Sequence, residues 1–364
     1  MNYLIGIERE GFRIDFEGKM ANTLHPQEFG DKLENPLIGT DFGEAMLELR
    51  THPQQTPETC YKELLKITAL ALEVLYKKGE LLWPYSVPYK TPEEADFFYN
   101  KYPGKPDMEE HERLITKVYG IKRNCLSGIH VNFSISNEML GKIRQIYPNV
   151  PDDKDEAYLK CAKNILAHEK ALRYFFDASP TDFEGKIVEE NSSRNGPAGF
   201  RNENAKKLDY SSKKAYIQSL KQTLSYERLS AIRLKSIDKE NFDEGIAEHG
   251  IERLEFRLCD IDPFDVCGIS LNEITLATAM IFMCIVIDKI PGNPKDILSK
   301  CAEVNRKLDL GFDNGIKYYM EQEKKGVTKS ETVRSFIKKK GYDGLIELAI
   351  HYGKNTIIKM AINY

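Results

Sequence analysis

Residues 4–10 read LIGIERE, and this short stretch has one apolar side and one acidic side. In a β-strand, alternate side chains point to opposite faces. Ile5 and Ile7 therefore share one face, and Glu8 and Glu10 share the other. The alternation predicts a strand that packs its apolar face on a core and directs two carboxylates away from that core.

Three later segments repeat this division into an apolar face and a polar face. Their polar faces carry Glu48, then His130 with Asn132, and then Glu255 between two arginines. A sheet face in water also carries charge, but solvated strands favour Thr, Lys and mixed charges. Carboxylates at close range repel each other unless a cation lies between them, so removing one of them is expected to preserve or raise stability. Residues 229–235 are a further expected strand. The expected strands are therefore residues 3–14, 44–50, 129–136, 229–235 and 250–259.

These residue types suit phosphate chemistry with divalent cations. Mg2+ prefers oxygen ligands and joins a few carboxylates to substrate phosphates, and a histidine among carboxylates also suits Mn2+. A guanidinium group matches phosphate oxygens with two parallel hydrogen bonds. The polar faces therefore predict phosphoryl transfer assisted by several cations rather than hydrolysis at one zinc ion.

Several common nucleotide and nucleophile motifs are absent from the sequence. It contains no GxxxxGK[ST], no GxGxxG after a strand and no GxSxG, so a P-loop, a dinucleotide site and a nucleophile elbow have no support. The formal net charge of -4 gives no reason to expect nucleic acid as a partner. Seven cysteines without a CxxC pair predict core thiols and a cytoplasmic location rather than a disulfide framework.

The wide spacing of the strands, with helical stretches between them, predicts an α+β fold. Thr56 and Pro57 form a helix start, and Gly79 is a stop. The apolar stretch 276–287 is shorter than the ~20 residues that cross a bilayer, so it predicts a buried helix and no membrane association. Helices are expected over residues 155–175, 210–225, 266–290 and 330–340, long loops over residues 88–112 and 177–206, and a single catalytic domain over residues 1–364 whose helical C-terminal part covers about 266–364.

Eight segments occur in an order that is typical of one enzyme family. They are GIEREGFRIDFEGKMANTLHP (6–26), TDFGEAMLEL (40–49), LWPYSVP (82–88), YG (119–120) followed by SGIHVNFS (127–134), DASP (177–180), SRNGPAGFRN (193–202), AIRLK (231–235) and GIERLEFRLCDIDPF (250–264). Together they make the chain resemble the bacterial glutamate–cysteine ligases of the gamma-proteobacterial type, which also form the first half of bifunctional glutathione synthases.

The resemblance implies both a fold and a reaction. The fold would be related to glutamine synthetase, with a curved antiparallel sheet that forms a funnel. ATP, with Mg2+ or Mn2+, would phosphorylate the γ-carboxylate of L-glutamate, and the amine of L-cysteine would attack the acyl phosphate. This is the first step of glutathione biosynthesis, and a separate glutathione synthetase would act downstream.

The same resemblance implies roles for individual residues. The metal ligands would be Glu8, Glu10, Asp41, Glu48, His130 and Glu255. ATP would be bound by Arg233, Lys235 and Arg257. The substrates would be bound by Phe42, Tyr119, Asn124, Asn132 and Arg194, together with Phe200 and Leu229. Catalysis would rest chiefly on Glu255, Arg257 and Arg194.

The acceptor side departs from the family pattern. Phe200 and Leu229 stand where tyrosines are expected, and the pair at 111–112 is His-Glu instead of Tyr-Arg. A buried site that lacks such polar partners binds a carboxylate less well, by roughly 1–3 kcal/mol per lost contact, unless Arg113 or Arg201 compensates.

Two alternatives follow from these departures. The first is a γ-glutamyl ligase of the same family that uses an amine acceptor other than cysteine. The second is a non-catalytic sensor of glutamate or nucleotide on the same fold. The complete set of metal ligands argues against the sensor, because a sensor has no need of them.

Overall fold

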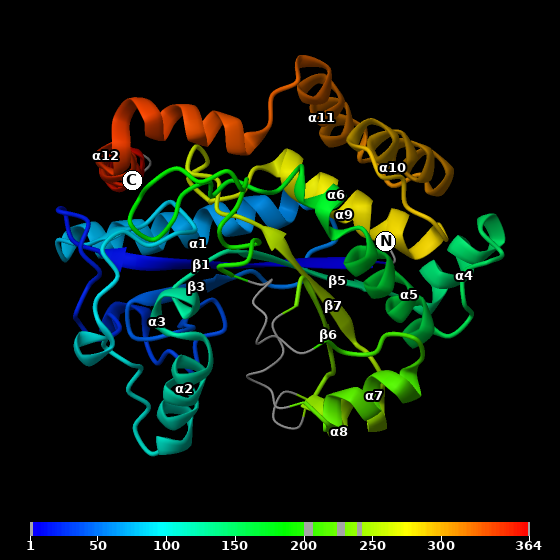
Figure 1. Cartoon of the computed structure of the whole chain (residues 1–364), viewed down its shortest axis with the longest axis horizontal. Helices are drawn as coiled ribbons and strands as arrows, with labels where there is room; N and C mark the ends of the chain where they lie inside the picture. Colours follow the sequence, from blue (N-terminus) through cyan, green and yellow to red (C-terminus); the bar gives the residue numbers. More distant parts are fainter. Residues whose placement is uncertain (1–2, 200–206, 224–229, 239–241, 363–364) are drawn as a thin grey trace.

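A single antiparallel sheet organises the chain. The computed structural model describes residues 3–199, 207–223, 230–238 and 242–362. Within that part of the chain, seven strands pair in the order β2-β3-β1-β5-β7-β6, with β4 paired to the end of β1. The strands are β1 (Tyr3–Ile14), β2 (Ile38–Thr40), β3 (Met46–Arg50), β4 (Leu81–Leu82), β5 (Ile129–Ile135), β6 (Ile232–Lys235) and β7 (Arg253–Cys259). Figure 1 shows this sheet at the centre of the molecule, twisted between β1 and β6.

Helices surround the sheet. They are α1 (Pro57–Lys77), α2 (Pro106–Tyr119), α3 (Ile121–Asn124), α4 (Asn137–Ile146), α5 (Lys154–Ala167), α6 (Glu169–Arg173), α7 (Lys213–Lys221), α8 (Phe242–His249), α9 (Leu271–Val286), α10 (Pro294–Leu308), α11 (Asp313–Lys325) and α12 (Lys329–Ile362), with 3-10 turns at Gln27–Phe29 and Glu94–Asp96. Figure 1 shows α1 and α9–α12 on one side of the sheet, and α2, α7 and α8 on the other. The α+β class predicted from the sequence is confirmed.

The strand register brings polar residues together on one face. Glu8 lies opposite His130 on β5, and Glu10 lies opposite Glu48 on β3. The next strand, β7, adds Glu255 beside β5. A slip of one residue would turn every apolar side chain of a strand to the polar face. Burial of the apolar face therefore fixes this register.

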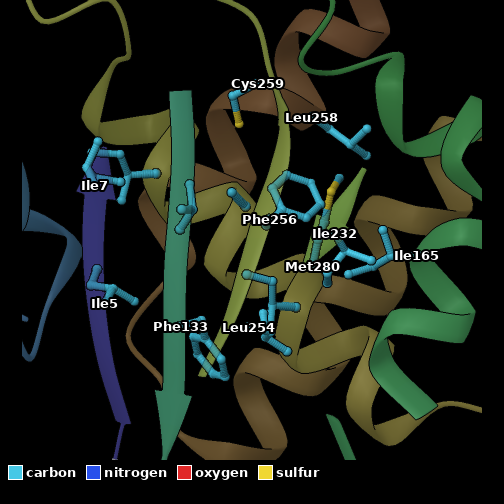
Figure 2. Close-up of a cluster of buried hydrophobic side chains, with 14 of the residues drawn as sticks. Ile5, Ile7, Phe133, Ile165, Ile232, Leu254, Phe256, Leu258, Cys259 and Met280 are labelled. Atoms are coloured by element: carbon cyan, nitrogen blue, oxygen red, sulfur yellow. The ribbon is translucent and has the colours of Figure 1, made fainter. Parts of the chain in front are cut away.

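The apolar face of the sheet packs on helices and forms the main core. Figure 2 shows Ile7 of β1, Phe133 of β5 and Phe256 of β7 on this face, near Ile165 of α5 and Met280 of α9. Each such side chain, fully buried, contributes roughly 1.5–3 kcal/mol relative to exposure. The core therefore fixes the sheet from one side and leaves the acidic face to form a site.

The expected strands are confirmed, and the largest difference lies in the expected loop 88–112. Its last part is helical, because α2 begins at Pro106, whose fixed φ suits the first helical position. The buried side of α2 consists of Glu112, Thr116 and Tyr119. Because polar residues occupy buried positions, the sequence lacks the apolar periodicity that would have predicted this helix.

The remaining helix predictions hold in most places. Thr56 caps α1 by accepting a hydrogen bond from Thr59 N at 3.2 Å. The expected helix 155–175 is divided into α5 and α6. The helices α3, α4 and α8 were not predicted, whereas α10 and α11 lie in the C-terminal part that was expected to be helical. Gly341, with φ of 63°, interrupts α12 where a helix end was expected. All seven cysteines are buried free thiols, and none of the described helices is long and apolar enough to cross a membrane.

Candidate active site

The polar face of the sheet, together with α2 and α3, encloses a cavity of about 590 Å³. Most of the predicted site residues line it, although they come from segments that lie far apart in the sequence. These residues are Glu8, Glu10, Asp41, Phe42, Glu48, Asn124, His130, Arg194, Arg233, Lys235, Glu255 and Arg257. The structure thus brings nearly all of the predicted chemistry into one place.

Two predicted substrate residues lie next to the cavity rather than in its lining. Tyr119 is buried on the inner side of α2. Asn132 supports the lining instead: its Nδ2 donates to Glu8 Oε1 at 2.9 Å, and its Oδ1 accepts a hydrogen bond from Arg253 Nε at 3.0 Å. Asn132 therefore orients the Glu8 carboxylate.

His130 stands at the centre of the acidic residues. Its Nδ1 lies 3.3 Å from an oxygen of Glu8 and 3.3 Å from an oxygen of Glu255, and its Nε2 lies 3.4 Å from Glu10 Oε1. The ligand atoms of Glu8, His130 and Glu255 all lie within 4.8 Å of one another. One divalent cation could contact all three, and the donor set of two carboxylates and an imidazole suits Mg2+ or Mn2+.

Glu255 is fully buried, and two cations flank it. Lys235 Nζ lies 2.8 Å from Oε2, and the Arg257 guanidinium contacts Oε1. Burial opposes ionisation, but Lys235 and then Arg257 outweigh it and hold the pKa of Glu255 well below its ordinary value. The repulsion between carboxylates expected from the sequence is offset at this position, because Lys235 of β6 and Arg257 of β7 converge on Glu255.

The pKa values of Asp41 and Glu48 are shifted in the opposite direction to that of Glu255. Burial, and next the charge of Glu10, raise the pKa of Asp41 to about 7. Burial, and next the charge of Glu8, raise the pKa of Glu48 well above its ordinary range. These carboxyl groups resist ionisation together in the protein alone, so a bound cation would bring them into the ionised form.

Arg194 is buried beneath this cluster. Its Nη1 donates to the carbonyl oxygens of Arg257 at 2.9 Å and Cys259 at 3.3 Å, and its Nη2 lies 3.4 Å from His130 Nε2. A Cβ at Gly128 would overlap the guanidinium carbon. The glycine of the SGIHVNFS segment is therefore needed so that Arg194 can approach the backbone of β5.

Gly128→Ala is expected to lower the free energy of unfolding by about 1–3 kcal/mol, the usual cost of overpacking a core, and to displace Arg194. Chemical denaturation measures this effect. Gly141→Ala is the matched control: Gly141 lies in α4 with no atom within 4 Å of an added Cβ, so alanine should be neutral or stabilising there. Equal stability of Gly128→Ala and the parent would contradict the tight contact with Arg194.

Helices α2 and α3 form a cavity wall that the sequence did not predict. Asp107, Met108, His111 and Ile115 line the cavity from α2. Their spacing places them on one face of the helix. This helical spacing was the sequence signal for the wall. It was missed because residues 88–112 were expected to form a loop.

The structure separates the arginines near this wall. Arg113 does not line the cavity: its Nη2 lies 3.0 Å from Glu109 Oε1, and its guanidinium lies over the Tyr99 ring at 4.4 Å from the centroid. Arg123 of α3 lines the cavity instead. Glu112 is buried and accepts a hydrogen bond from Asn100 N at 3.0 Å. The other residues of the expected acceptor side lie outside the described residues; they are Phe200, Arg201 and Leu229.

The fold matches those of two solved structures. A glutamate–cysteine ligase from Francisella tularensis, in complex with AMP, has a TM-score of 0.82 at 20% identity, and the match covers 98% of this chain and 89% of that chain. A bifunctional glutathione synthetase from Pasteurella multocida has a TM-score of 0.84 at 24% identity, covering 98% of this chain and 53% of that chain. At these identities the likeness establishes the fold.

The sequence comparisons establish the family. The sequence model of the glutamate-cysteine ligase family matches residues 1–230 and 204–306. The chain is 35% identical over 300 residues to the glutathione biosynthesis bifunctional protein GshAB of Listeria monocytogenes, covering 74% of this chain and 38% of that protein. It is 30% identical over 346 residues to a glutamate–cysteine ligase of Clostridium acetobutylicum, covering 77% and 71%. The chain belongs to the glutamate–cysteine ligase family, and it spans less than two fifths of the length of the bifunctional relatives that it matches.

Proposed function

We propose that this chain is an ATP- and Mg2+-dependent ligase that joins the γ-carboxylate of L-glutamate to the amine of L-cysteine, the first step of glutathione biosynthesis. Family membership supports the proposal, as do relatives named for this ligase activity and for glutathione biosynthesis. The observation that carries it is the cavity in which His130 lies among three carboxylates, next to the cations that flank Glu255. The AMP complex of the Francisella ligase supports an adenine nucleotide as the ligand.

The acidic residues are proposed to hold divalent cations. When bound, Mg2+, or Mn2+ in its place, would neutralise charge on the ATP phosphates and on the substrate carboxylate. The raised pKa values of Asp41 and Glu48 support this role, because carboxyl groups that repel each other gain from a cation between them. The proposed ligands are Glu8, Glu10, Asp41, Glu48, His130 and Glu255.

The arginines and the lysine of β6 and β7 are proposed to bind the ATP phosphates. Arg233, Lys235 and Arg257 line the same cavity, and guanidinium groups match phosphate oxygens in pairs. A γ-carboxylate oxygen of glutamate would attack the γ-phosphorus while the bond to the bridging oxygen breaks and ADP leaves. The acceptor amine would then attack the acyl carbon and phosphate would leave. Positioned positive charge is the main source of rate enhancement in such transfers.

The remaining predicted residues are proposed to position the substrates. Arg194 lies beside His130, and Asn124 lines the cavity near Phe42, so these side chains would contact glutamate or the acceptor. Tyr119 and Asn132 would act from behind the lining. Phe200 and Leu229 lie outside the described residues, and their role on the acceptor side stays a prediction. Glu255, Arg257 and Arg194 are proposed as the residues on which catalysis depends most.

A second candidate function differs only in the acceptor amine. It is favoured by the wall of α2, which presents His111, where a tyrosine is expected in the family, together with Asp107, Met108 and Ile115. These groups could also accommodate an amine that is larger or more polar than cysteine.

A panel assay tests both candidates. The purified protein would receive ATP, Mg2+, L-glutamate and one of many amines, and phosphate release would be measured, with omission of glutamate and addition of a chelator as controls. The proposal predicts release that requires glutamate and the metal and is fastest with L-cysteine. Faster release with another amine would favour the second candidate. No release with any amine would contradict both candidates and favour the non-catalytic sensor.

Three further properties are proposed with this function. Residues 1–364 would act as one catalytic domain, since one core joins side chains of the sheet, such as Leu254, to Met280 and Val304 of the C-terminal helices. The enzyme would work in the cytoplasm, and a separate glutathione synthetase would use its product.

A further inference from the structure

The cavity has two chemically different sides. The sheet side carries the acidic cluster and the cations of β6 and β7, whereas α2 and α3 contribute a wall with one arginine, Arg123. Figure 1 shows α2 and α3 below β3 and away from β6. A second charged ligand group could therefore bind at this wall without competing for Lys235 or Arg257.

Arg123 is half-buried, and one hydrogen bond holds it in place. Its Nε donates to the carbonyl oxygen of Ala198 at 3.2 Å. Within the described residues it forms no ion pair, whereas Lys235 and Arg257 both contact Glu255. An arginine has five N–H donors in a planar fork, and the bond from Nε leaves the terminal nitrogens in the geometry that a carboxylate matches with two bonds.

The neighbouring arginine cannot take this role. Arg113 forms an ion pair with Glu109 and stacks on Tyr99, outside the cavity. Glu112, on the cavity side of α2, is acidic and accepts a hydrogen bond from Asn100 N. Arg123 is therefore the cation that the described part of this wall offers to a ligand.

We propose that Arg123 binds the carboxylate of the acceptor, so that the acceptor is an α-amino acid rather than an amine without a carboxylate. The inference rests on the proposed ligase function and deepens it, because it names the acceptor class and the residue that selects it. A charge-assisted bond from Arg123 would supply a strong polar contact for this carboxylate.

The test compares L-cysteine with cysteamine, which has the same amine and thiol but no carboxylate. Arg123→Ala should raise the KM for L-cysteine about 10- to 100-fold, as expected for a lost hydrogen bond to a charged group. The KM values for cysteamine, glutamate and ATP should stay at the parent level. Arg123→Lys keeps the charge but loses the fork, so it should fall between the parent and Arg123→Ala. The matched control is Arg113→Ala, which removes an arginine from the outside of the same wall and should change none of these values.

Two results would overturn the assignment. One is an equal effect of Arg123→Ala on L-cysteine and cysteamine, and the other is a raised KM for glutamate or ATP with L-cysteine unaffected. If the parent releases no phosphate with any amine, the proposed function fails. Calorimetric measurement of the binding of L-cysteine and cysteamine then tests the role of Arg123 separately. Binding of L-cysteine that is tighter than that of cysteamine and is lost in Arg123→Ala would support the inference, whereas equal or absent binding of both would reject it.

Discussion

Glu255→Gln is expected to slow glutamate-dependent phosphate release by about 100- to 1000-fold, the usual cost of removing one group that stabilises transition-state charge. The carboxamide keeps the size of the side chain but removes the charge that faces His130, Lys235 and Arg257. The change would weaken the proposed metal site and leave Lys235 and Arg257 without the negative charge that they contact. Release at saturating ATP and glutamate, measured over a range of Mg2+ concentrations, gives the effect.

The same change should also destabilise the protein. Because Glu255 is buried and held ionised by Lys235 and Arg257, its replacement leaves buried charge uncompensated, at a cost of about 1–3 kcal/mol or more. The sequence alone predicted the reverse sign, because that prediction was argued from repulsion between the carboxylates. Glu252→Gln is the control, because Glu252 is exposed and pairs with Arg253 outside the cavity. Full activity of Glu255→Gln at ordinary Mg2+ would remove Glu255 from the site.

Lys329→Met is expected to lower the free energy of unfolding above about pH 8, by up to the roughly 3–5 kcal/mol that breaking a buried ion pair costs, because Glu273 is ionised in the parent only in that range. Lys329 Nζ lies 2.5 Å from Glu273 Oε1, and the Glu273 side chain is fully buried between α9 and α12. Met keeps most of the volume, so the loss reports the charge that remains alone on Glu273. Urea denaturation measures it, and the double variant with Glu273→Leu should recover most of the stability.

The loss should depend on pH in a defined direction. Burial raises the pKa of Glu273 from 4.5 to about 8 even with Lys329 beside it, and removal of Lys329 would raise it further. A carboxyl group whose pKa is higher in the folded state stabilises the protein fully below its unfolded pKa and loses this contribution as pH rises toward the folded pKa. Between pH 5 and pH 8 Glu273 is protonated in both folded proteins, so their stabilities should change in parallel. Above pH 8 the carboxyl group ionises in the parent first, and the variant should fall behind by up to about 1.4 kcal/mol per pH unit.

A surface pair provides the control for this second prediction. Lys300→Met removes an exposed partner of Glu303 and should cost less than about 1 kcal/mol, with little pH dependence. A similar loss in both variants, or a loss in Lys329→Met that does not grow between pH 8 and pH 10, would contradict the assignment of a buried charge at Glu273.

The period-two pattern allowed the strands and the acidic face to be predicted from residues such as Ile7 and Glu8. Side chains on neighbouring positions of a strand separate onto two faces whatever the rest of the fold does, so this information is local. The metal-ligand candidates and the family resemblance rest on the same short segments. The helix α2 was missed because its buried side is carried by Glu112, Thr116 and Tyr119, and polar residues at helical spacing do not reveal burial.

By itself, the sequence determined the five longer strands, the residues of these strands that face the site and the family that the chain resembles, because each depends on residues close together in the chain. Only the tertiary structure decided that Lys235 and Arg257 converge on Glu255, and that Arg123 rather than Arg113 lines the cavity. The ionisation of the carboxylates was decided there too: the pKa of Glu255 is lowered and that of Glu48 is raised. The physical reason is that charge interactions and burial depend on distances across strands and helices that the packed core sets, and neither distance nor burial is contained in the local pattern.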